Sequence, residues 1–414
     1  MSNQLLTISM ITNEALRVLT NQLVFTRAVS RQYDDKFAIE GAKIGTTINL
    51  RKPPRYVGRT GPALQVESSV ETYVPLTLGT QFGVDMAFTT QDLTMNISDF
   101  SDRFIKPAVA AVANKIDYDG LQQFYNVYNL VGTPGQLTGA TAPTQAQSTA
   151  AILAARARLN QEAAPVDEER HIVVDPATEV GIVNGLTNLF NPQGTISRIF
   201  QKGALGDSTL GFNFAMDQNV GNFTTGTATA FTVSAQAGGS VQTNAQTTFT
   251  LAVSSTSGTL TAGTVFTIPG VYAVNPQSRQ STGALRNFVI TTTAAGSSTS
   301  LTIFPVPVFS GQFQNVTSST GTIPSGTATI LSGASGSAAT YAQSLAFHRD
   351  AFAFGTADLI LPQGVDMAGR ASADGVSIRL VRQYDINSDQ LPCRLDVLYG
   401  WSTVYPELAC RITG

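Results

Sequence analysis

The sequence predicts an α+β protein that carries an all-β domain inserted into its second half. Residues 12–217 mix segments of helical period with segments of strand period. The composition then changes, because residues 218–347 contain two charged residues, and Gly, Ser and Thr supply 57 of the 120 positions from 221 to 340. Strand patterns of ordinary composition return over residues 348–414, and we expect them to complete the sheet of the first domain.

The first predicted element is an amphipathic helix over about residues 12–32. Leu16, Leu19 and Leu23 recur at helical spacing, and Thr12 and Asn13 are candidate N-caps. The apolar face of this helix has to be buried against the chain's own core or against a neighbouring subunit. The sequence leaves both alternatives open.

Two segments of alternating apolar residues predict the arms of a long antiparallel hairpin over about residues 41–90. The first arm alternates from Ile44 to Leu50, and the second alternates from Phe82 to Phe88. We expect the tip of this hairpin to carry a basic cluster, which consists of Arg51, Lys52, Arg55 and Arg59.

The basic cluster has three candidate roles. It could bind the phosphates of nucleic acid, contact an acidic surface on a neighbouring protein subunit, or form a solvated loop. Tyr56 is the one aromatic residue among these cations, so a platform for base stacking is not supported. We therefore favour the contact with a neighbouring subunit.

A long helix is predicted after the hairpin, over about residues 98–128. Val109, Val112 and Ile116 recur at spacings of three and four, and Pro107 has to lie in the first turns because an interior proline breaks the backbone ladder. At 1.5 Å per residue this helix would span about 45 Å, as an element that braces an elongated protein would. A shorter helix at about 149–160, a buried strand at 171–176 and a helix with a loop at 177–200 are predicted to follow.

Short runs rich in β-branched and aromatic residues fill the inserted segment of residues 218–347. They include TTFTLAV, TVFTI, NFVITTT and SLTIFPV, with turn residues between them. A flexible linker would lack this pattern. The insertion is therefore predicted to be a small β-barrel or β-sandwich.

Few residues are available for chemistry. The sequence has no Gly-rich phosphate loop and no nucleophile elbow, and its two His and two Cys residues do not form metal-ligand motifs. The sequence has two tight carboxylate clusters. Asp117 and Asp119 are explained best as part of a solvated helix surface, and the run Asp167, Glu168 and Glu169 as an acidic loop. We predict no enzyme activity, no cofactor and no metal site.

Charge and hydropathy exclude two further classes of protein. A net charge of -3 provides no basic field of the kind that a free DNA-binding regulator needs. No apolar run approaches the roughly 18 residues of a membrane-spanning helix. We expect a protein that is made in the cytoplasm and has no membrane partner.

One part of the insertion closely resembles a known family. The run LTAGTVFTIPGVYAVNP at residues 260–276, followed by LRNFVITT and TIFPVPV, resembles the insertion domain of the P-twenty-two-like major coat proteins of tailed bacteriophages. The residues that carry the resemblance are Gly263, Phe266, Gly270, Tyr272, Val274, Asn275, Pro276 and Phe288. The segment RQYDDKF and the closing YGWSTVYPELACRI resemble the same family, so that the resemblance covers essentially the whole chain.

The resemblance implies the Hong Kong 97 capsid fold with peripheral and axial domains. Its parts would be an N-terminal arm at residues 1–40, a capsid core at 41–217 with an E-loop hairpin and a spine helix, an inserted β-barrel at 218–347, and a return to the core at 348–414. The E-loop hairpin corresponds to the hairpin of about residues 41–90, and the spine helix to the helix of about 98–128.

The resemblance also implies a function and partners. The protein would be a major capsid protein that forms pentamers and hexamers, assembles with a scaffolding protein into an icosahedral procapsid with a portal, and encloses double-stranded DNA through non-specific contacts. The E-loop cations would contact a neighbouring subunit, and Glu14 lies where the family has an acidic residue that binds scaffolding. The alternative is a β-rich tail, decoration or surface-binding protein, which leaves the long helix and the first helix without a role.

The insertion departs from the family pattern in its charge. Some members use an acidic loop of the insertion for salt bridges between capsomers, whereas residues 218–347 contain no Asp or Glu. Either the contacts of this insertion are apolar and hydrogen-bonded, or the insertion stabilises only its own subunit.

Overall fold

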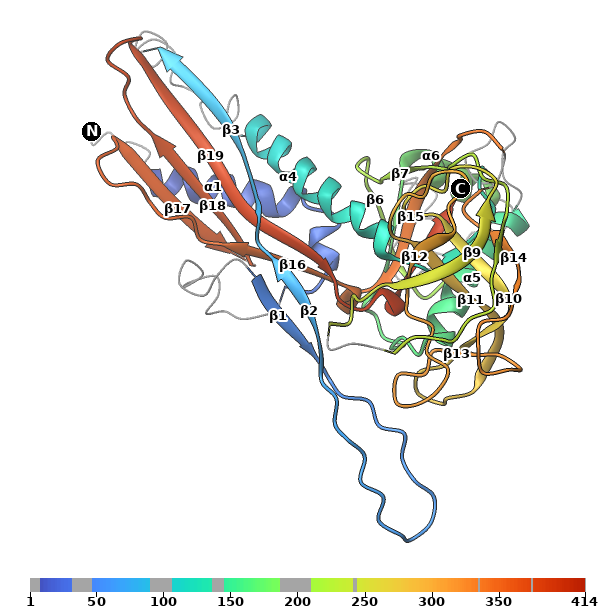
Figure 1. Cartoon of the computed structure of the whole chain (residues 1–414). Helices are drawn as coiled ribbons and strands as arrows, with labels where there is room; N and C mark the ends of the chain where they lie inside the picture. Colours follow the sequence, from blue (N-terminus) through green and yellow to red (C-terminus); the bar gives the residue numbers. More distant parts are fainter. Residues whose placement is uncertain are drawn as a thin grey trace, which may run out of the picture. The chain divides into compact units, whose positions relative to one another are not determined.

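A computed structural model of the chain describes residues 8–31, 47–89, 106–135, 145–186, 210–240, 244–333, 336–373 and 375–413. The chain forms two compact units, each built from three separate segments (Figure 1). Unit 1 consists of Met1–Leu50, Pro75–Gly120 and Phe352–Ser402, and unit 2 consists of Arg51–Val74, Leu121–Ala351 and Thr403–Gly414.

Unit 1 contains a sheet whose longest strand is β19 (Gln390–Thr403). Strands β16 (Phe352–Ala357), β18 (Val376–Arg382) and β3 (Thr80–Thr89) pair with β19, and β17 (Met367–Ala373) pairs with β18. Figure 1 shows β3 running along β19, and β17 and β18 lying beside them. The sheet therefore joins a strand from the first quarter of the chain to four strands near the C-terminus.

The prediction that residues 82–88 form the second arm of the hairpin is wrong. Val84 lies opposite Leu395, because β3 pairs with β19. The hairpin instead joins β1 (Thr47–Lys52) to β2 (Thr72–Thr77), and residues 41–46 of the predicted first arm lie outside the described residues. An alternating pattern says which face of a strand is buried and does not say which strand lies next to it.

Helix α1 (Ile8–Gln22) lies against β17 and β18, and it begins and ends earlier than the predicted helix of residues 12–32. Leu16 and Leu19 are buried as the helical spacing predicts. Thr12 and Asn13 both lie inside the helix, and Thr12 is fully buried, so the prediction that they cap the N-terminus is wrong. An N-cap has to precede the first turn, whereas Thr12 lies four residues after Ile8, the first residue of α1.

A carboxylate of the next helix holds the segment that follows α1. Asp117, which is 2% exposed, accepts hydrogen bonds from the backbone N–H groups of Val24 at 2.7 Å and Thr26 at 3.1 Å, and from the Thr26 hydroxyl at 2.5 Å. Val24 and Thr26 follow the last residue of α1, and Thr26 begins the 3₁₀ turn η1 (Thr26–Ala28), so Asp117 pairs backbone donors that have no helical partner there. The interpretation of Asp117 as part of a solvated helix surface is therefore wrong.

The predicted long helix corresponds to α4 (Lys106–Leu121) and the 3₁₀ turn η5 (Gln122–Asn126) that follows it. Pro107 lies in the first turn, as expected. The α-helical part ends before the predicted residue 128, and residues 98–105 lie outside the described residues. Gly120 lies in the last turn, where an added Cβ would come within 2.6 Å of the Trp401 ring, so close packing at this point requires glycine.

The core of unit 2 is a mixed sheet. Its strands follow the order β4 (Leu130–Val131), β20 (Ala409–Thr413), β15 (Thr340–His348), β5 (Arg170–Val174) and β6 (Asn213–Met216), and the short β7 (Asn222–Thr224) pairs with β15. The pairs β20–β4 and β5–β6 are parallel, and β15 runs antiparallel to β20 and β5. The predicted buried strand at 171–176 is therefore β5.

Two helices pack together in unit 2. Helix α5 (Gln145–Gln161) covers the predicted helix of residues 149–160, and α6 (Pro176–Leu186) follows β5. Ile152 and Leu159 of α5 are buried in one apolar cluster with Cys410 of β20. Helix α6 covers part of the predicted segment 177–200, of which residues 187–200 lie outside the described residues.

The insertion folds into a closed six-stranded barrel. Its strands follow the order β11 (Ser281–Ile290), β12 (Ser300–Phe304), β9 (Phe249–Thr256), β8 (Phe231–Val233), β14 (Gly326–Ile330) and β10 (Val265–Val274). Strand β10 pairs with β11 and closes the ring, and β13 (Val316–Thr317) adds to β10. Of the two predicted alternatives, the structure has the barrel, which leaves no open edge in the ring.

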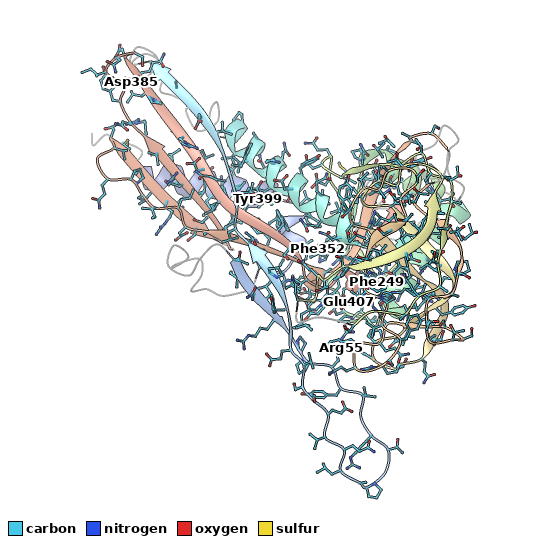
Figure 2. All side chains as sticks on the ribbon, in the orientation of Figure 1. Arg55, Phe249, Phe352, Asp385, Tyr399 and Glu407 are labelled. Carbon is cyan, nitrogen blue, oxygen red and sulfur yellow. The ribbon has the colours of Figure 1, made fainter. Side chains whose placement is uncertain are left out.

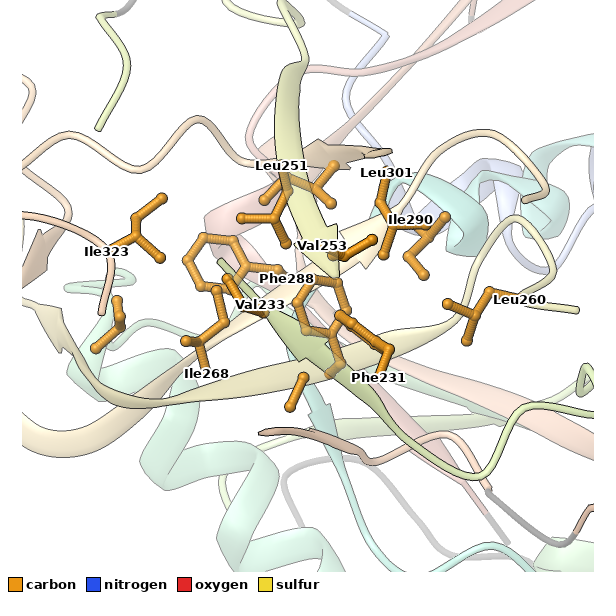
Figure 3. Packing of buried hydrophobic residues seen from close by; sticks show 14 of the residues in the cluster. Phe231, Val233, Leu251, Val253, Leu260, Ile268, Phe288, Ile290, Leu301 and Ile323 are labelled. Atoms are coloured by element: carbon orange, nitrogen blue, oxygen red, sulfur yellow. The ribbon is translucent and has the colours of Figure 1, made fainter. Parts of the chain in front are cut away.

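Aromatic and aliphatic side chains fill the barrel interior (Figure 3). Phe266 packs on Phe231 at 5.0 Å between ring centroids and on Phe288 at 5.9 Å. Phe231, Leu251 and Ile268 are among the residues of this core that are at most 2% exposed. The apolar residues of a segment rich in Ser, Thr and Gly thus gather in the barrel interior.

Candidate interaction surface

The hairpin carries an extended loop, residues 53–71, which we call the hairpin loop. Its two sides are joined by side chains, because Glu67 accepts hydrogen bonds from the backbone N–H groups of Val57 at 2.8 Å and Gly58 at 2.7 Å. The Tyr56 hydroxyl and the Ser69 hydroxyl lie 3.2 Å apart and make a second link. The loop therefore has a defined shape without a strand ladder of its own.

Apolar side chains of the hairpin loop are exposed. Leu64 is 83% exposed and Val66 is 85% exposed, while Tyr56 and Val57 are each more than half exposed. Scattered exposed apolar residues are ordinary, but several on one extended loop form a surface that is stabilised when a second protein covers it.

Two cations of the predicted cluster have a partner in their own chain. Arg55 Nη2 donates to Glu407 Oε1 at 3.0 Å, and Figure 2 labels both residues. Lys52 Nζ lies 3.6 Å from the same oxygen and donates to the Val404 carbonyl oxygen at 2.8 Å. Burial disfavours the charged form of Glu407, but Lys52 and Arg55, together with a backbone hydrogen bond and Arg286, hold the pKa of its carboxyl below the ordinary value. The sequence alone did not identify Glu407 as the partner of Arg55, because the two residues are 352 positions apart and no motif around Glu407 indicates the contact.

The other two cations of the cluster lie differently. Arg51 and Arg59 are exposed, and Arg59 donates to the carbonyl oxygen of Gly61 in its own loop. Within the part of the chain that the structure describes, neither forms a salt bridge. Of the four predicted contact residues, Lys52 and Arg55 thus hold the hairpin base, and Arg51 and Arg59 are exposed. The contact of these residues with a neighbouring subunit stays a prediction.

A cavity of about 270 Å³ lies next to the hairpin base. Its wall includes three cations and two carboxylates, namely Lys52, Arg55, Arg286, Glu162 and Glu407. The carboxylates neutralise most of the positive charge, so the cavity has no strong preference for an anion or a cation.

The residues that carry the family resemblance occupy defined places in the barrel. Phe266 and Phe288 lie opposite each other on β10 and β11, and both are fully buried. Val274 is buried, whereas Tyr272 is 40% exposed. Asn275 begins a turn with Pro276, in which its side-chain oxygen accepts the N–H groups of Gln277 and Ser278 at 2.9 Å.

Two glycines of the same motif have positive φ angles. Gly263 has a φ of +92°, and a Cβ at this position would lie 2.5 Å from the Tyr125 ring. The Gly263 carbonyl oxygen also accepts a hydrogen bond from Arg411 Nη1 at 2.8 Å. Gly270 has a φ of +81° and lies in a less crowded place, because its nearest neighbour would be Pro324 at 3.5 Å.

Glu14, the predicted scaffolding contact, lies on α1 and forms an ion pair with Arg17 at 2.6 Å. Both side chains reach solvent, with 34% of Glu14 and 67% of Arg17 exposed. The position of Glu14 is thus accessible to a partner protein, and the role itself stays a prediction.

The other titratable clusters are used within the chain. Asp119 accepts the Tyr399 hydroxyl at 2.6 Å and pairs with Lys115 at 2.6 Å. Asp167 lies 3.1 Å from His348 Nε2, and hydrogen bonds from His348 and a backbone N–H lower the pKa of its carboxyl against the effect of burial. Among the described residues, no group of three metal-ligating side chains could hold an ion. No helix in the same part of the chain is long and apolar enough to cross a membrane.

Several solved structures are similar to this one. The structure from Mycobacterium phage Che8 is 12% identical in sequence, with 94% of this chain and 90% of that chain covered at a TM-score of 0.47. The mature capsid of bacteriophage PhiM1 is 12% identical, with 90% and 82% covered at a TM-score of 0.42. The CUS-3 coat protein I-domain is 28% identical, with 25% of this chain and 97% of that domain covered at a TM-score of 0.20. No curated protein matches the sequence.

A family model of phage coat proteins matches residues 2–414, which is nearly the whole chain. The match defines the protein as a bacteriophage major capsid protein, a component of the virion that assembles into a shell of many copies. The family is that of the P22 coat protein, gene protein 5, and the chain belongs to it. The predicted fold class, an α+β Hong Kong 97-like capsid fold with an inserted barrel, is confirmed, and a structural role follows from the family.

Proposed function

We propose that this chain is the major capsid protein of a tailed bacteriophage and that its pentamers and hexamers form an icosahedral shell around double-stranded DNA. The family match over residues 2–414 carries the proposal. The shell assembles on a scaffolding protein in the host bacterial cytoplasm, with a portal protein at one vertex. The DNA is held by non-specific contacts, and no catalytic step is involved.

The hairpin loop is the proposed contact with a neighbouring subunit. The exposed side chains of Leu64 and Val66 supply apolar area, and Arg59 of the loop and Arg51 of the adjoining strand β1 supply charge. Interfaces between subunits of permanent assemblies are apolar at their centres and polar at their rims. Lys52 and Arg55 act in this scheme as anchors of the hairpin base, because Glu407 of the same chain binds both.

Two further roles are proposed for other parts of the chain. Glu14 of the N-terminal arm, residues 1–40, binds the scaffolding protein through its accessible carboxylate. The capsid core of residues 41–217 and 348–414 forms the shell wall, and the insertion of residues 218–347, which lacks acidic residues, stabilises its own subunit.

Electron microscopy of the protein expressed with and without the scaffolding gene of its genome tests the function. We expect closed, uniform shells when scaffolding is present. The double variant Arg51→Gln with Arg59→Gln should give fewer shells, whereas Arg27→Gln, which removes an exposed arginine elsewhere, should assemble normally. Monomers, rings or short fibres from the wild type in both samples would overturn the proposal.

A further inference from the structure

We propose that the inserted barrel is a brace for the hairpin loop of its own chain, and that Arg279 and Gln312 hold the two sides of that loop. Both residues and the whole hairpin loop belong to unit 2. The brace goes beyond the proposed function because it is a property of a single chain. Its consequence for assembly rests on the proposed contact between the hairpin loop and a neighbouring subunit.

Arg279 reaches one side of the hairpin loop. It donates through Nη1 to the Gly311 carbonyl oxygen at 2.6 Å and through Nη2 to the Tyr56 carbonyl oxygen at 3.3 Å. One guanidinium therefore joins a loop of the barrel to the hairpin loop, which uses the fork of donors that distinguishes arginine from lysine.

The backbone at Arg279 has an unusual conformation. Its φ is +58°, in the left-handed region that residues other than glycine seldom adopt. The surrounding turn is well defined, because Arg279 N–H donates to the Asn275 carbonyl oxygen at 3.0 Å and Asn275 N–H donates to the Gln280 carbonyl oxygen at 3.0 Å. An arginine kept at a strained position that presents its side chain to another segment points to a role for that side chain.

The insertion uses both of its charged residues to hold other parts of the chain. Arg286 pairs with Glu162, which lies just after helix α5, and Arg279 binds the hairpin loop. A domain that otherwise lacks charge thus directs its two cations to segments outside residues 218–347. An insertion without acidic residues can thus still stabilise its own chain, through its two arginines.

Gln312 reaches the other side of the hairpin loop. Its Nε2 donates to the Ser68 carbonyl oxygen at 3.4 Å, and it directly follows Gly311, which accepts from Arg279. The bonds from Arg279 and Gln312 both end on backbone oxygens of the hairpin loop. The contact between the Tyr56 and Ser69 hydroxyls joins the two sides of the loop that these bonds hold. These hydrogen bonds to the loop backbone therefore leave the exposed side chains of the loop available to contact a partner.

The base of the hairpin is attached to the same unit at separate points. Ala245 N–H donates to the Tyr73 carbonyl oxygen at 2.9 Å, so that the barrel segment also binds the backbone at the second strand. Lys52 at the end of the first strand and Arg55 at the start of the loop both bind Glu407. The hairpin is therefore bonded to the rest of unit 2 at its base and at residues 56 and 68. The end of the loop around Leu64 and Val66 lies beyond these attachment points.

Holding the loop in advance of assembly would have a physical benefit. A segment without a strand ladder loses conformational freedom when a partner orders it, and this loss weakens binding. A brace within the monomer restricts the loop before the partner arrives. Contact between subunits would then form faster and with higher affinity.

Hydrogen exchange of the full-length monomer, read by mass spectrometry, tests the brace. The variants are Arg279→Gly, Gln312→Ala and the two combined, because glycine adopts a φ of +58° without strain and the turn should keep its fold. We expect the amides of Val57 and Gly58, which donate to Glu67, to exchange at least about fivefold faster in the double variant. Gln277→Ala, in the same turn with an exposed side chain, should leave their exchange unchanged.

Exchange at strands β10 and β11 separates the brace from general damage. Unchanged rates in these strands, together with faster exchange in the hairpin loop, would support the brace. Loop rates within twofold of wild type in the double variant would overturn it, as would equal acceleration in the loop and both strands. Failure of the wild type to form shells would overturn the proposed function while leaving the monomer result valid.

Discussion

Arg286 of strand β11 and Glu162, which follows helix α5, form an ion pair of 2.5 Å in which the side chains are 4% and 5% exposed. The Arg286 guanidinium also lies 4.6 Å from the centroid of the Tyr128 ring. The pair joins the barrel to the core of unit 2 through two side chains that are almost completely buried. A buried charge without its partner is costly, so each residue makes the other necessary.

We predict that Glu162→Gln lowers the free energy of unfolding by about 3–5 kcal/mol, because Arg286 keeps its charge in a buried site without a carboxylate. Urea unfolding of the monomer measures the change, provided that the slope with denaturant stays constant.

The double variant Glu162→Leu with Arg286→Met is the control for this prediction. Replacing both charges by apolar side chains removes the uncompensated charge, so the double variant should be more stable than Glu162→Gln. A double variant that loses as much as the two single changes added together would contradict the account.

Gly263→Ala should be far more harmful than Gly283→Ala. Both glycines have positive φ angles, +92° and +74°, so each substitution carries a backbone penalty of about 1 kcal/mol. At Gly263 the new Cβ would also lie 2.5 Å from the Tyr125 ring, whereas nothing lies within 4 Å at Gly283. We expect a total loss of about 2–4 kcal/mol at Gly263 once overpacking is added.

Thermal unfolding of the two glycine variants checks this difference. Gly283→Ala serves as the matched control, since it has the same backbone requirement without the steric conflict. Equal melting temperatures for the two variants would show that the close approach of Tyr125 does not matter.

The stability contributed by Glu407 should depend on pH. Lys52 and Arg55 hold the pKa of this carboxyl below its ordinary value despite burial, so the folded state binds its proton less readily than the unfolded state. The contribution is therefore present above the unfolded pKa of about 4.3 and is lost as pH falls through the lower folded value.

Urea unfolding of the wild type and of Glu407→Gln at pH 7, 5 and 3.5 measures this contribution. The difference in unfolding free energy between the two proteins should be largest at pH 5–7 and should narrow below about pH 4. Asp167 also has a lowered pKa, so the wild type and the variant should share a remaining acid sensitivity. A difference that stays constant over this range would mean that the charge of Glu407 is not what stabilises the hairpin base.

Local patterns predicted the elements whose residues contact one another at short range. Val109, Val112 and Ile116 recur at helical spacing and are buried in α4, because one face of a helix is determined within a few turns. The run TVFTI, rich in β-branched and aromatic residues, likewise predicted a strand, and Phe266 and Ile268 of this run lie in the barrel core.

The sequence by itself determined the all-β insertion, the helices α4 and α5 and the scarcity of charge, because period and composition are properties of neighbouring residues. Tertiary structure alone decided that β3 pairs with β19, that β1 pairs with β2, and that Glu407 binds Lys52 and Arg55. Pairing between strands and between charges depends on which segments folding brings together. A local pattern of apolar or charged residues fits many complementary segments, so it does not specify which of them becomes the partner.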